Sequence, residues 1–129
     1  MRIWVNGCFD VLHVGHIQLL GYAKTLGHVL VGVDSDERVK QLKGDDRPIN
    51  PIEHRIKMLE SLKFVDDVIT FDTDTDLNDI LYVYQPDVIV IGDEYKSKNI
   101  IGAEHAKEIY FFEKNIDIST TKILNYKKN

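Results

Sequence analysis

Two glycines and two histidines lie close together in the stretch from Asn6 to His16. Gly7 and Gly15 would let the backbone approach a ligand closely. His13 and His16 bracket Gly15 where we expect a helix to begin, and the free N–H groups of a helix N-terminus attract anions. Two imidazoles there can donate hydrogen bonds to phosphoryl oxygens. Taken alone, however, the four residues fit an ordinary strand-to-helix turn better than a phosphate site.

Strands and helices alternate along the rest of the sequence. Short β-branched runs bounded by turn residues predict buried parallel strands at 3–6 and 29–33. Further apolar runs predict strands within 65–71, at 88–91 and at 109–112. Apolar residues at helical spacing predict helices at 17–26, 51–63 and 77–84, and a last helix from 120 to about 127 with Ser119 as its cap. Residues 104–107 are compatible with a short helical segment. This order predicts an α/β fold: a Rossmann-like doubly wound parallel sheet of about five strands, with helices on both faces and ligands at the carboxyl ends of the strands.

Composition limits the classes of function. The length of 129 residues and a hydrophobic content of 43% predict one globular domain, residues 1–129. Acidic residues outnumber basic ones by 21 to 16, which disfavours nucleic acid as a partner. Cys8 is the single cysteine, which excludes an internal disulfide and fits a reducing compartment. Because we find no signal peptide and no membrane-spanning run, we expect a cytoplasmic protein with no membrane partner.

Three blocks of sequence resemble one enzyme family. The stretch Gly7-Cys8-Phe9-Asp10-Val11-Leu12-His13-Val14-Gly15-His16 fills every fixed position of the G-x-F-D-x-x-H-x-G-H signature of the cytidylyltransferase-like nucleotidyltransferases. Glu53-His54-Arg55, followed by Met58-Leu59-Glu60 and Val65-Asp66, resembles the helix that carries the family's arginine. Ile118-Ser119-Thr120-Thr121-Lys122-Ile123 is similar to the I-S-T-T-K-I segment of glycerol-3-phosphate cytidylyltransferases. The blocks occur in family order over nearly the whole chain, which argues against chance agreement.

The resemblance implies a set of site residues. The catalytic residues would be His13, His16, Lys43 and Arg55. The residues implied at the nucleotide are Gly7, Cys8, Phe9, Asp10, Gly15, Gly92, Asp93, Tyr95, Ser119, Thr120 and Thr121. Those expected at the acceptor are Asp36, Lys40, Arg47 and Lys114. We expect Mg²⁺ to be bound mainly through the substrate phosphates, and we assign no direct protein ligand to it.

Several of these residues also fit ordinary structural roles. Arg55 fits a surface ion pair as well as a phosphate contact, and serine and threonine runs at helix starts are more often plain caps. Asp10 fits either a water-mediated contact to Mg²⁺ or a turn that holds the backbone of the site. Asp34 and Asp36 can approach either substrate but commonly cap the following helix. Cys8 is most simply a packing residue, because direct transfer needs no enzyme nucleophile.

The segments that should select the substrates point in two directions. The chain length, Glu53-His54-Arg55 and the I-S-T-T-K-I block agree with glycerol-3-phosphate cytidylyltransferase. The segments Leu42–Pro51 and Gly92–Lys96 look more like the adenylyltransferase domain of ADP-heptose synthases, and Lys114 stands near an arginine position of the glycerol branch. The sequence narrowly favours CTP and a phosphorylated polyol such as glycerol 3-phosphate, with release of pyrophosphate. The alternative is transfer from ATP to a sugar 1-phosphate such as heptose 1-phosphate.

Other classes of protein share parts of this pattern. A non-catalytic nucleotide-binding module would have the same architecture. An aminoacyl-tRNA synthetase fragment, which the H-x-G-H tetrad suggests, fits poorly because 129 residues leave no evident tRNA-binding domain. The family resemblance implies a homodimer, although no sequence pattern indicates one. We expect the polar segment Lys43–Pro51 to be a mobile active-site loop.

Overall fold

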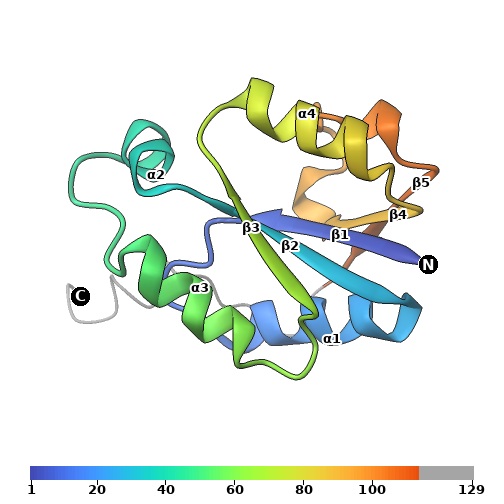
Figure 1. Cartoon of the computed structure of the whole chain (residues 1–129), viewed down its shortest axis with the longest axis horizontal. Coiled ribbons are helices and arrows are strands. Elements are labelled where there is room, and N and C mark those ends of the chain that lie inside the picture. Colours follow the sequence, from blue (N-terminus) through green and yellow to red (C-terminus); the bar gives the residue numbers. More distant parts are fainter. Residues whose placement is uncertain (114–129) are drawn as a thin grey trace.

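A five-stranded parallel sheet lies at the centre of the computed structural model, which describes residues 1–113 (Figure 1). The strands are β1 (Arg2–Gly7), β2 (His28–Asp34), β3 (Asp67–Phe71), β4 (Val88–Gly92) and β5 (Glu108–Phe112). Their order, β3-β2-β1-β4-β5, confirms the predicted Rossmann-like sheet. Strands β2 and β3 follow β1 on one side, and β4 and β5 lie on its other side. The topological switch point of the sheet therefore lies between β1 and β4.

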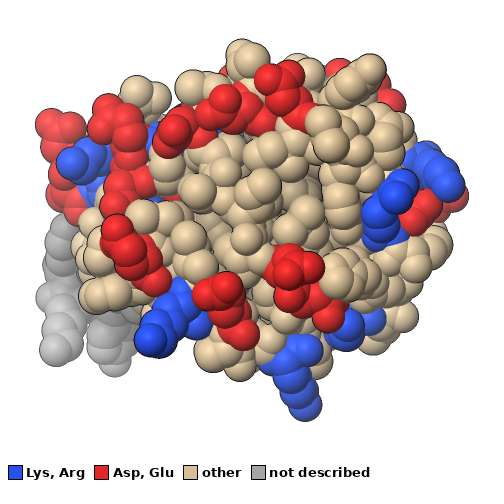
Figure 2. Space-filling model, in the orientation of Figure 1, with Lys and Arg blue, Asp and Glu red and all other residues tan. Residues whose placement is uncertain are grey.

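Helices cover both faces of this sheet. They are α1 (Val14–Leu26), α2 (Asp36–Lys43), α3 (Ile52–Glu60) and α4 (Asp74–Tyr84), with short 3-10 turns at Asp93–Tyr95 and Ala103–His105. Figure 1 shows α1 and α3 on one side of the sheet and α4 on the other. Figure 2 shows acidic side chains gathered along the edge formed by α4, whose first turns carry Asp74, Asp76 and Asp79.

Within residues 1–113, no helix has the length and apolar character needed to cross a membrane.

The central strand shows how the sequence fits the sheet. Ile3 and Val5 pack in the core cluster shared with α1 and α3, whereas Trp4 packs in the cluster shared with α4, because successive side chains of a strand alternate. All three are at most 2% exposed, which is why this strand reads as a continuous apolar run. Gly32 on β2 lies against the Trp4 indole, and a Cβ at that position would collide with the ring.

The structure corrects several element boundaries. Helix α4 begins at Asp74 rather than at 77, because the Thr73 side chain accepts a hydrogen bond from the Asp76 N–H and caps the helix three residues earlier. Helix α3 ends at Glu60 rather than at 63, and Pro51 precedes the helix as its N-cap. Of residues 104–107, only Glu104 and His105 are helical, as part of the 3-10 turn at Ala103–His105.

Helix α2 is an element that the sequence analysis did not define. Its residues carry few apolar side chains, and only Val39 is buried. The start of the helix is fixed locally, because the Ser35 side chain accepts a hydrogen bond from the Arg38 N–H. The helix brings Lys43 to the pocket described below.

The predictions for Lys114, Ser119, Thr120, Thr121 and the last helix lie outside the described residues.

Candidate active site

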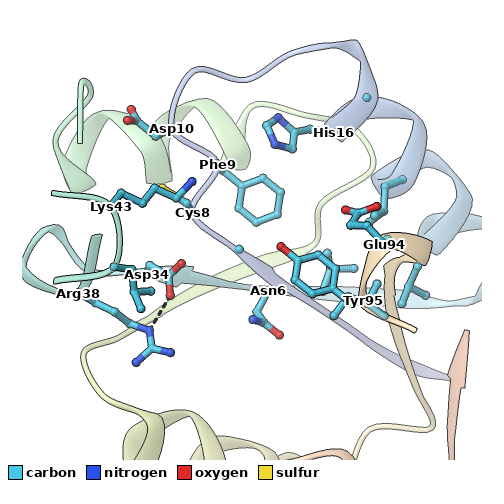
Figure 3. A pocket seen from close by; sticks show the side chains of 18 residues that line it. Asn6, Cys8, Phe9, Asp10, His16, Asp34, Arg38, Lys43, Glu94 and Tyr95 are labelled. Atoms are coloured by element: carbon cyan, nitrogen blue, oxygen red, sulfur yellow. Dashed lines mark hydrogen bonds and ion pairs between the residues drawn. The ribbon is translucent and has the colours of Figure 1, made fainter. Parts of the chain in front are cut away.

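A pocket of about 360 Å³ opens at the carboxyl ends of β1, β2 and β4, which is the switch point of the sheet (Figure 3). This volume is typical of small-molecule sites. The predicted site residues that line it are Gly7, Cys8, Phe9, Asp10, Gly15, His16, Lys43, Gly92 and Tyr95. Those described by the structure that lie outside the lining are His13, Asp36, Lys40, Arg47, Arg55 and Asp93.

His13 and His16 are coupled at the start of α1. Their rings stack with centroids 3.8 Å apart and an interplanar angle of 22°. The Gly15 N–H donates to Nδ1 of His13 at 3.1 Å, and the His13 N–H donates to Nδ1 of His16 at 3.2 Å. Because each Nδ1 accepts, each neutral ring carries its proton on Nε2. The pair therefore carries two Nε2–H groups at a helix N-terminus, where an anion is favoured; His16 lines the pocket, whereas His13 is 9% exposed and lies outside its lining.

The loop between β1 and α1 has an unusual backbone. Phe9 and Val11 adopt left-handed conformations, with φ of 51° and 63°. This region is disfavoured for residues with bulky or β-branched side chains. The Phe9 ring lies 5.3 Å from the His16 ring, measured between centroids, and is 6% exposed. The loop thus passes through two left-handed residues and packs the Phe9 ring beside the His16 ring.

Asp10 secures this loop to the segment before α3. Its carboxylate accepts hydrogen bonds from the N–H groups of Ile49 and Asn50, both at 2.8 Å, and from Nε of Arg47 at 3.0 Å. Burial acts to raise the pKa of Asp10, but the hydrogen bonds from Ile49, Asn50 and Arg47 outweigh it and hold the pKa below its ordinary value. Of the two roles open to Asp10, this geometry favours holding the backbone of the site.

Arg55 lies beneath the pocket rather than on its wall. Its side chain is fully buried and donates to three backbone carbonyl groups and to one carboxylate. The carbonyl acceptors are those of Asn50 at 2.9 Å, Cys8 at 2.9 Å and Asp34 at 2.7 Å; the carboxylate is that of Asp36, at 2.7 Å from Nη2. The guanidinium is thus engaged by its own chain, which favours a positioning role over the phosphate contact that the resemblance implies.

The residues expected at the acceptor have different positions. Asp36 is held by Arg55, and Arg47 is held by Asp10, with an exposure of 9%. Lys40 is exposed on α2, outside the pocket lining. Lys43, at the end of the same helix, does line the pocket, so of these two lysines of α2 the structure brings only Lys43 to the site.

The turn after β4 forms the opposite wall. Gly92 ends the strand, and the carboxylate of Glu94 occupies the space that a Cβ at Gly92 would need. Burial, followed by the nearby Glu94 and Asp34 carboxylates, raises the pKa of the Tyr95 hydroxyl, so it is a neutral donor at physiological pH. The turn thus brings a carboxylate and a neutral phenol to this wall of the pocket.

Two further features of the pocket are the Cys8 thiol and the groups that could hold a metal ion. Burial is the main cause that raises the pKa of the Cys8 thiol, which fits the packing role expected for it. Over residues 1–113, no three His, Cys, Asp or Glu side chains converge to hold a metal ion. The acids on the pocket wall fit a Mg²⁺ ion held mainly by substrate phosphates, and this ion stays a prediction.

The structure adds pocket residues that the sequence analysis weighted little or missed. These are Asn6, Asp34, Arg38 and Glu94. Asp34 and Arg38, four positions apart in the sequence, form an ion pair at 2.9 Å. An acid and an arginine four positions apart could have predicted this ion pair from the sequence, but only if α2 had been recognised as a helix.

Comparisons with known proteins identify the family of this chain. The model of the cytidylyltransferase-like family matches residues 4–125. The bifunctional protein HldE of Campylobacter fetus subsp. fetus is 45% identical over 95% of this chain and 27% of its own length, and that of a Nitratiruptor species is 47% identical over 95% and 26%. The chain therefore spans about a quarter of the length of these relatives.

Solved structures show the same fold. The lipopolysaccharide core biosynthesis protein from Thermoplasma volcanium has a TM-score of 0.68 and 27% identity, over 89% of this chain and 96% of that one. The pantothenate synthetase from Thermus thermophilus, with a TM-score of 0.66 but only 14% identity, covers 95% of this chain and 61% of its own, and shares the fold alone. The signature from Gly7 to His16 and the match over residues 4–125 together show that the chain belongs to the cytidylyltransferase-like family of nucleotidyltransferases.

Proposed function

We propose that this chain transfers AMP from ATP to a sugar 1-phosphate such as heptose 1-phosphate, forming an ADP-linked sugar and releasing pyrophosphate. The observation that carries the choice of substrates is the identity of 45% and 47% to bifunctional HldE proteins, which we take to represent the ADP-heptose synthase branch. The segments Leu42–Pro51 and Gly92–Lys96 resemble the same branch. The narrow preference of the sequence for CTP and glycerol 3-phosphate is therefore replaced by its alternative.

The geometry of the histidine pair supports nucleotidyl transfer. An oxygen of the acceptor phosphate attacks the α-phosphorus of ATP, an O–P bond forms, and the bond to the β-phosphate breaks in line with it. The Nε2–H groups of His13 and His16 and the amino group of Lys43 stabilise the negative charge that develops on the α-phosphate and the leaving pyrophosphate. The N-terminus of α1 adds its partial positive charge.

The protein does not have to supply a strong base or a nucleophile. The acceptor phosphate carries an ionised oxygen at neutral pH, and the raised pKa of Cys8 keeps that thiol protonated. Mg²⁺, held mainly by the substrate phosphates, would supply further charge neutralisation when bound. Catalysis then rests on the position and electrostatics of the histidine pair and Lys43.

A four-way assay tests the choice of substrates. The purified protein is incubated with ATP or CTP and with heptose 1-phosphate or glycerol 3-phosphate, and pyrophosphate release is followed. We expect the highest kcat/KM for ATP with heptose 1-phosphate. A higher kcat/KM for CTP with glycerol 3-phosphate would instead assign the chain to the glycerol-3-phosphate cytidylyltransferases. If no pair of substrates released pyrophosphate, the proposed reaction would be wrong.

A further inference from the structure

Asp34 is a pocket residue to which the proposed reaction gives no role. It ends β2 and lines the pocket, and its side chain is 13% exposed. Its Oδ1 atom accepts a hydrogen bond from Nε of Arg38 at 2.9 Å. Within residues 1–113, no hydrogen bond reaches its other oxygen, Oδ2. Because only one carboxylate oxygen of Asp34 accepts a hydrogen bond from the described part of the chain, the other can accept hydrogen bonds from a ligand in the pocket.

Arg38 fixes this carboxylate in place. Its Nη2 donates to Asp74 on α4 at 2.8 Å, and its Cζ lies 5.2 Å from the centre of the Phe71 ring. Three partners thus hold the guanidinium on the outer side of Asp34, as Figure 3 shows for the dashed contact between the two side chains. A carboxylate that is already oriented loses little entropy when it binds a ligand.

The charge of Asp34 indicates which part of a substrate it meets. A carboxylate repels phosphate oxygens, so Asp34 does not face the triphosphate or the acceptor phosphate directly. It accepts hydrogen bonds well from hydroxyl groups, and such bonds to a charged acceptor are stronger than neutral ones. Leu42, which is 62% exposed at the same pocket, provides an apolar surface for the C–H face of a sugar ring.

The position of Asp34 selects between the two substrates. Glu94 and Tyr95 come from the turn after β4, where the family resemblance places the nucleoside. Asp34, Arg38 and Lys43 come from β2 and α2, and Figure 3 shows them across the pocket from Glu94 and Tyr95. In-line attack requires the acceptor oxygen and the leaving pyrophosphate to lie on opposite sides of the α-phosphorus. With the nucleoside at the turn after β4, the wall that carries Asp34 is left for the acceptor.

We propose that Asp34, oriented by Arg38, accepts hydrogen bonds from hydroxyl groups of the sugar acceptor and so selects a polyhydroxylated phosphate ester. This inference rests on the proposed function and adds a specificity residue to its acceptor side. Asp34 then takes the place of Asp36, which the sequence analysis expected at the acceptor, because the Asp36 carboxylate is bound by Arg55.

Binding and turnover of Asp34→Asn test the inference. Asparagine keeps the size of the side chain but removes the charge. We expect the KM for heptose 1-phosphate, and its Kd measured by calorimetry with a non-hydrolysable ATP analogue present, to rise by about ten- to hundredfold. The KM for ATP and the Mg²⁺ requirement should change by less than about twofold. Asp34→Ser should behave in the same way and provides a second fold-competent background.

Asp79→Asn is the matched control, since it makes the same charge change on the exposed side of α4 and should leave every constant unchanged. Monodeoxy analogues of the sugar 1-phosphate sharpen the assignment: for the analogue that lacks the contacted hydroxyl, wild type and Asp34→Asn should bind equally. A rise in the KM for ATP would assign Asp34 to the ribose, and a raised Mg²⁺ requirement would assign it to the metal; either result overturns the inference, as does an unchanged Kd for the acceptor. If the wild type binds heptose 1-phosphate but releases no pyrophosphate, the proposed reaction fails while the Kd comparison still decides the role of Asp34.

Discussion

The imidazole rings of His13 and His16 use their two nitrogens differently. On each ring Nδ1 accepts a backbone N–H from the start of α1, which leaves the proton on Nε2. One nitrogen therefore stabilises the helix start, and the other is the donor that we assign to the phosphates. An alanine substitution removes both functions at once, so it cannot separate them.

His13→Asn separates them. The asparagine oxygen can replace Nδ1 as acceptor of the Gly15 N–H, but the side chain has no donor at the position of Nε2. We expect the free energy of unfolding to stay within about 0.5 kcal/mol of wild type, whereas His13→Ala should lose about 1 kcal/mol. Both variants should lose about 10²- to 10³-fold in kcat. Chemical denaturation and pyrophosphate release measure the two quantities, and full turnover in the asparagine variant would sink the catalytic role. If the wild-type protein itself binds nucleotide but releases no pyrophosphate, the result would instead favour a non-catalytic module.

Asp10 gives a prediction about pH. Its pKa in the folded state lies below the ordinary value of 3.8, so the ionised form stabilises the fold above that pH. The stabilisation is lost as pH falls through the folded value. We expect Asp10→Asn to lower the free energy of unfolding by about 2 kcal/mol at pH 7. The difference from wild type should stay constant down to about pH 5 and shrink below about pH 4. Urea titrations at several pH values measure it, and a gap that widens in acid would contradict the tether.

At the scale of elements, Arg55 on α3 ties three segments together. It joins the loop after β1 at Cys8, the end of β2 at Asp34 and the segment before α3 at Asn50. Lysine offers one ammonium group instead of a planar fork and would leave buried carbonyl groups without donors. We expect Arg55→Lys to cost about 3–5 kcal/mol in free energy of unfolding.

Equilibrium denaturation of Arg55→Lys, beside the exposed control Arg2→Lys, distinguishes a positioning role from a catalytic one. The control should differ from wild type by less than about 0.5 kcal/mol. If Arg55→Lys kept wild-type stability but lost turnover, Arg55 would be a substrate contact, as the family resemblance implies, and the positioning role would be wrong.

The fold was predictable because its signals are local. The five strands contain short apolar runs, and the Gly7–His16 signature marks the turn from β1 to α1. Helix α2 was not predicted, because Val39 is its only buried residue and a single buried residue gives no helical apolar pattern in the sequence. The site was only partly predictable, because contacts such as Asp10 with Ile49 and Arg55 with Cys8 join residues that lie far apart in the sequence. Nothing in the residue types reveals whether an arginine faces a ligand or its own backbone.

At the scale of the whole molecule, the substrates rather than the reaction were the difficult part. The signature that identifies the family contains the histidine pair that we assign to the phosphates, which CTP and ATP share, and so it cannot distinguish CTP from ATP. The distinguishing segments, Leu42–Pro51 and Gly92–Lys96, pointed to one branch while the block at Ile118–Ile123 pointed to the other. The homodimer, the cytoplasmic location and the single domain over residues 1–129 stay predictions.

The central claim is that the chain moves AMP from ATP onto a sugar 1-phosphate. The most direct measurement offers equimolar ATP and CTP together with heptose 1-phosphate and identifies the nucleotide sugar by mass spectrometry. Competition in one vessel compares kcat/KM for the two nucleotides directly. We expect an ADP-linked sugar in large excess and stoichiometric pyrophosphate. A CDP-linked sugar as the main product, or no nucleotide sugar at all, would contradict it.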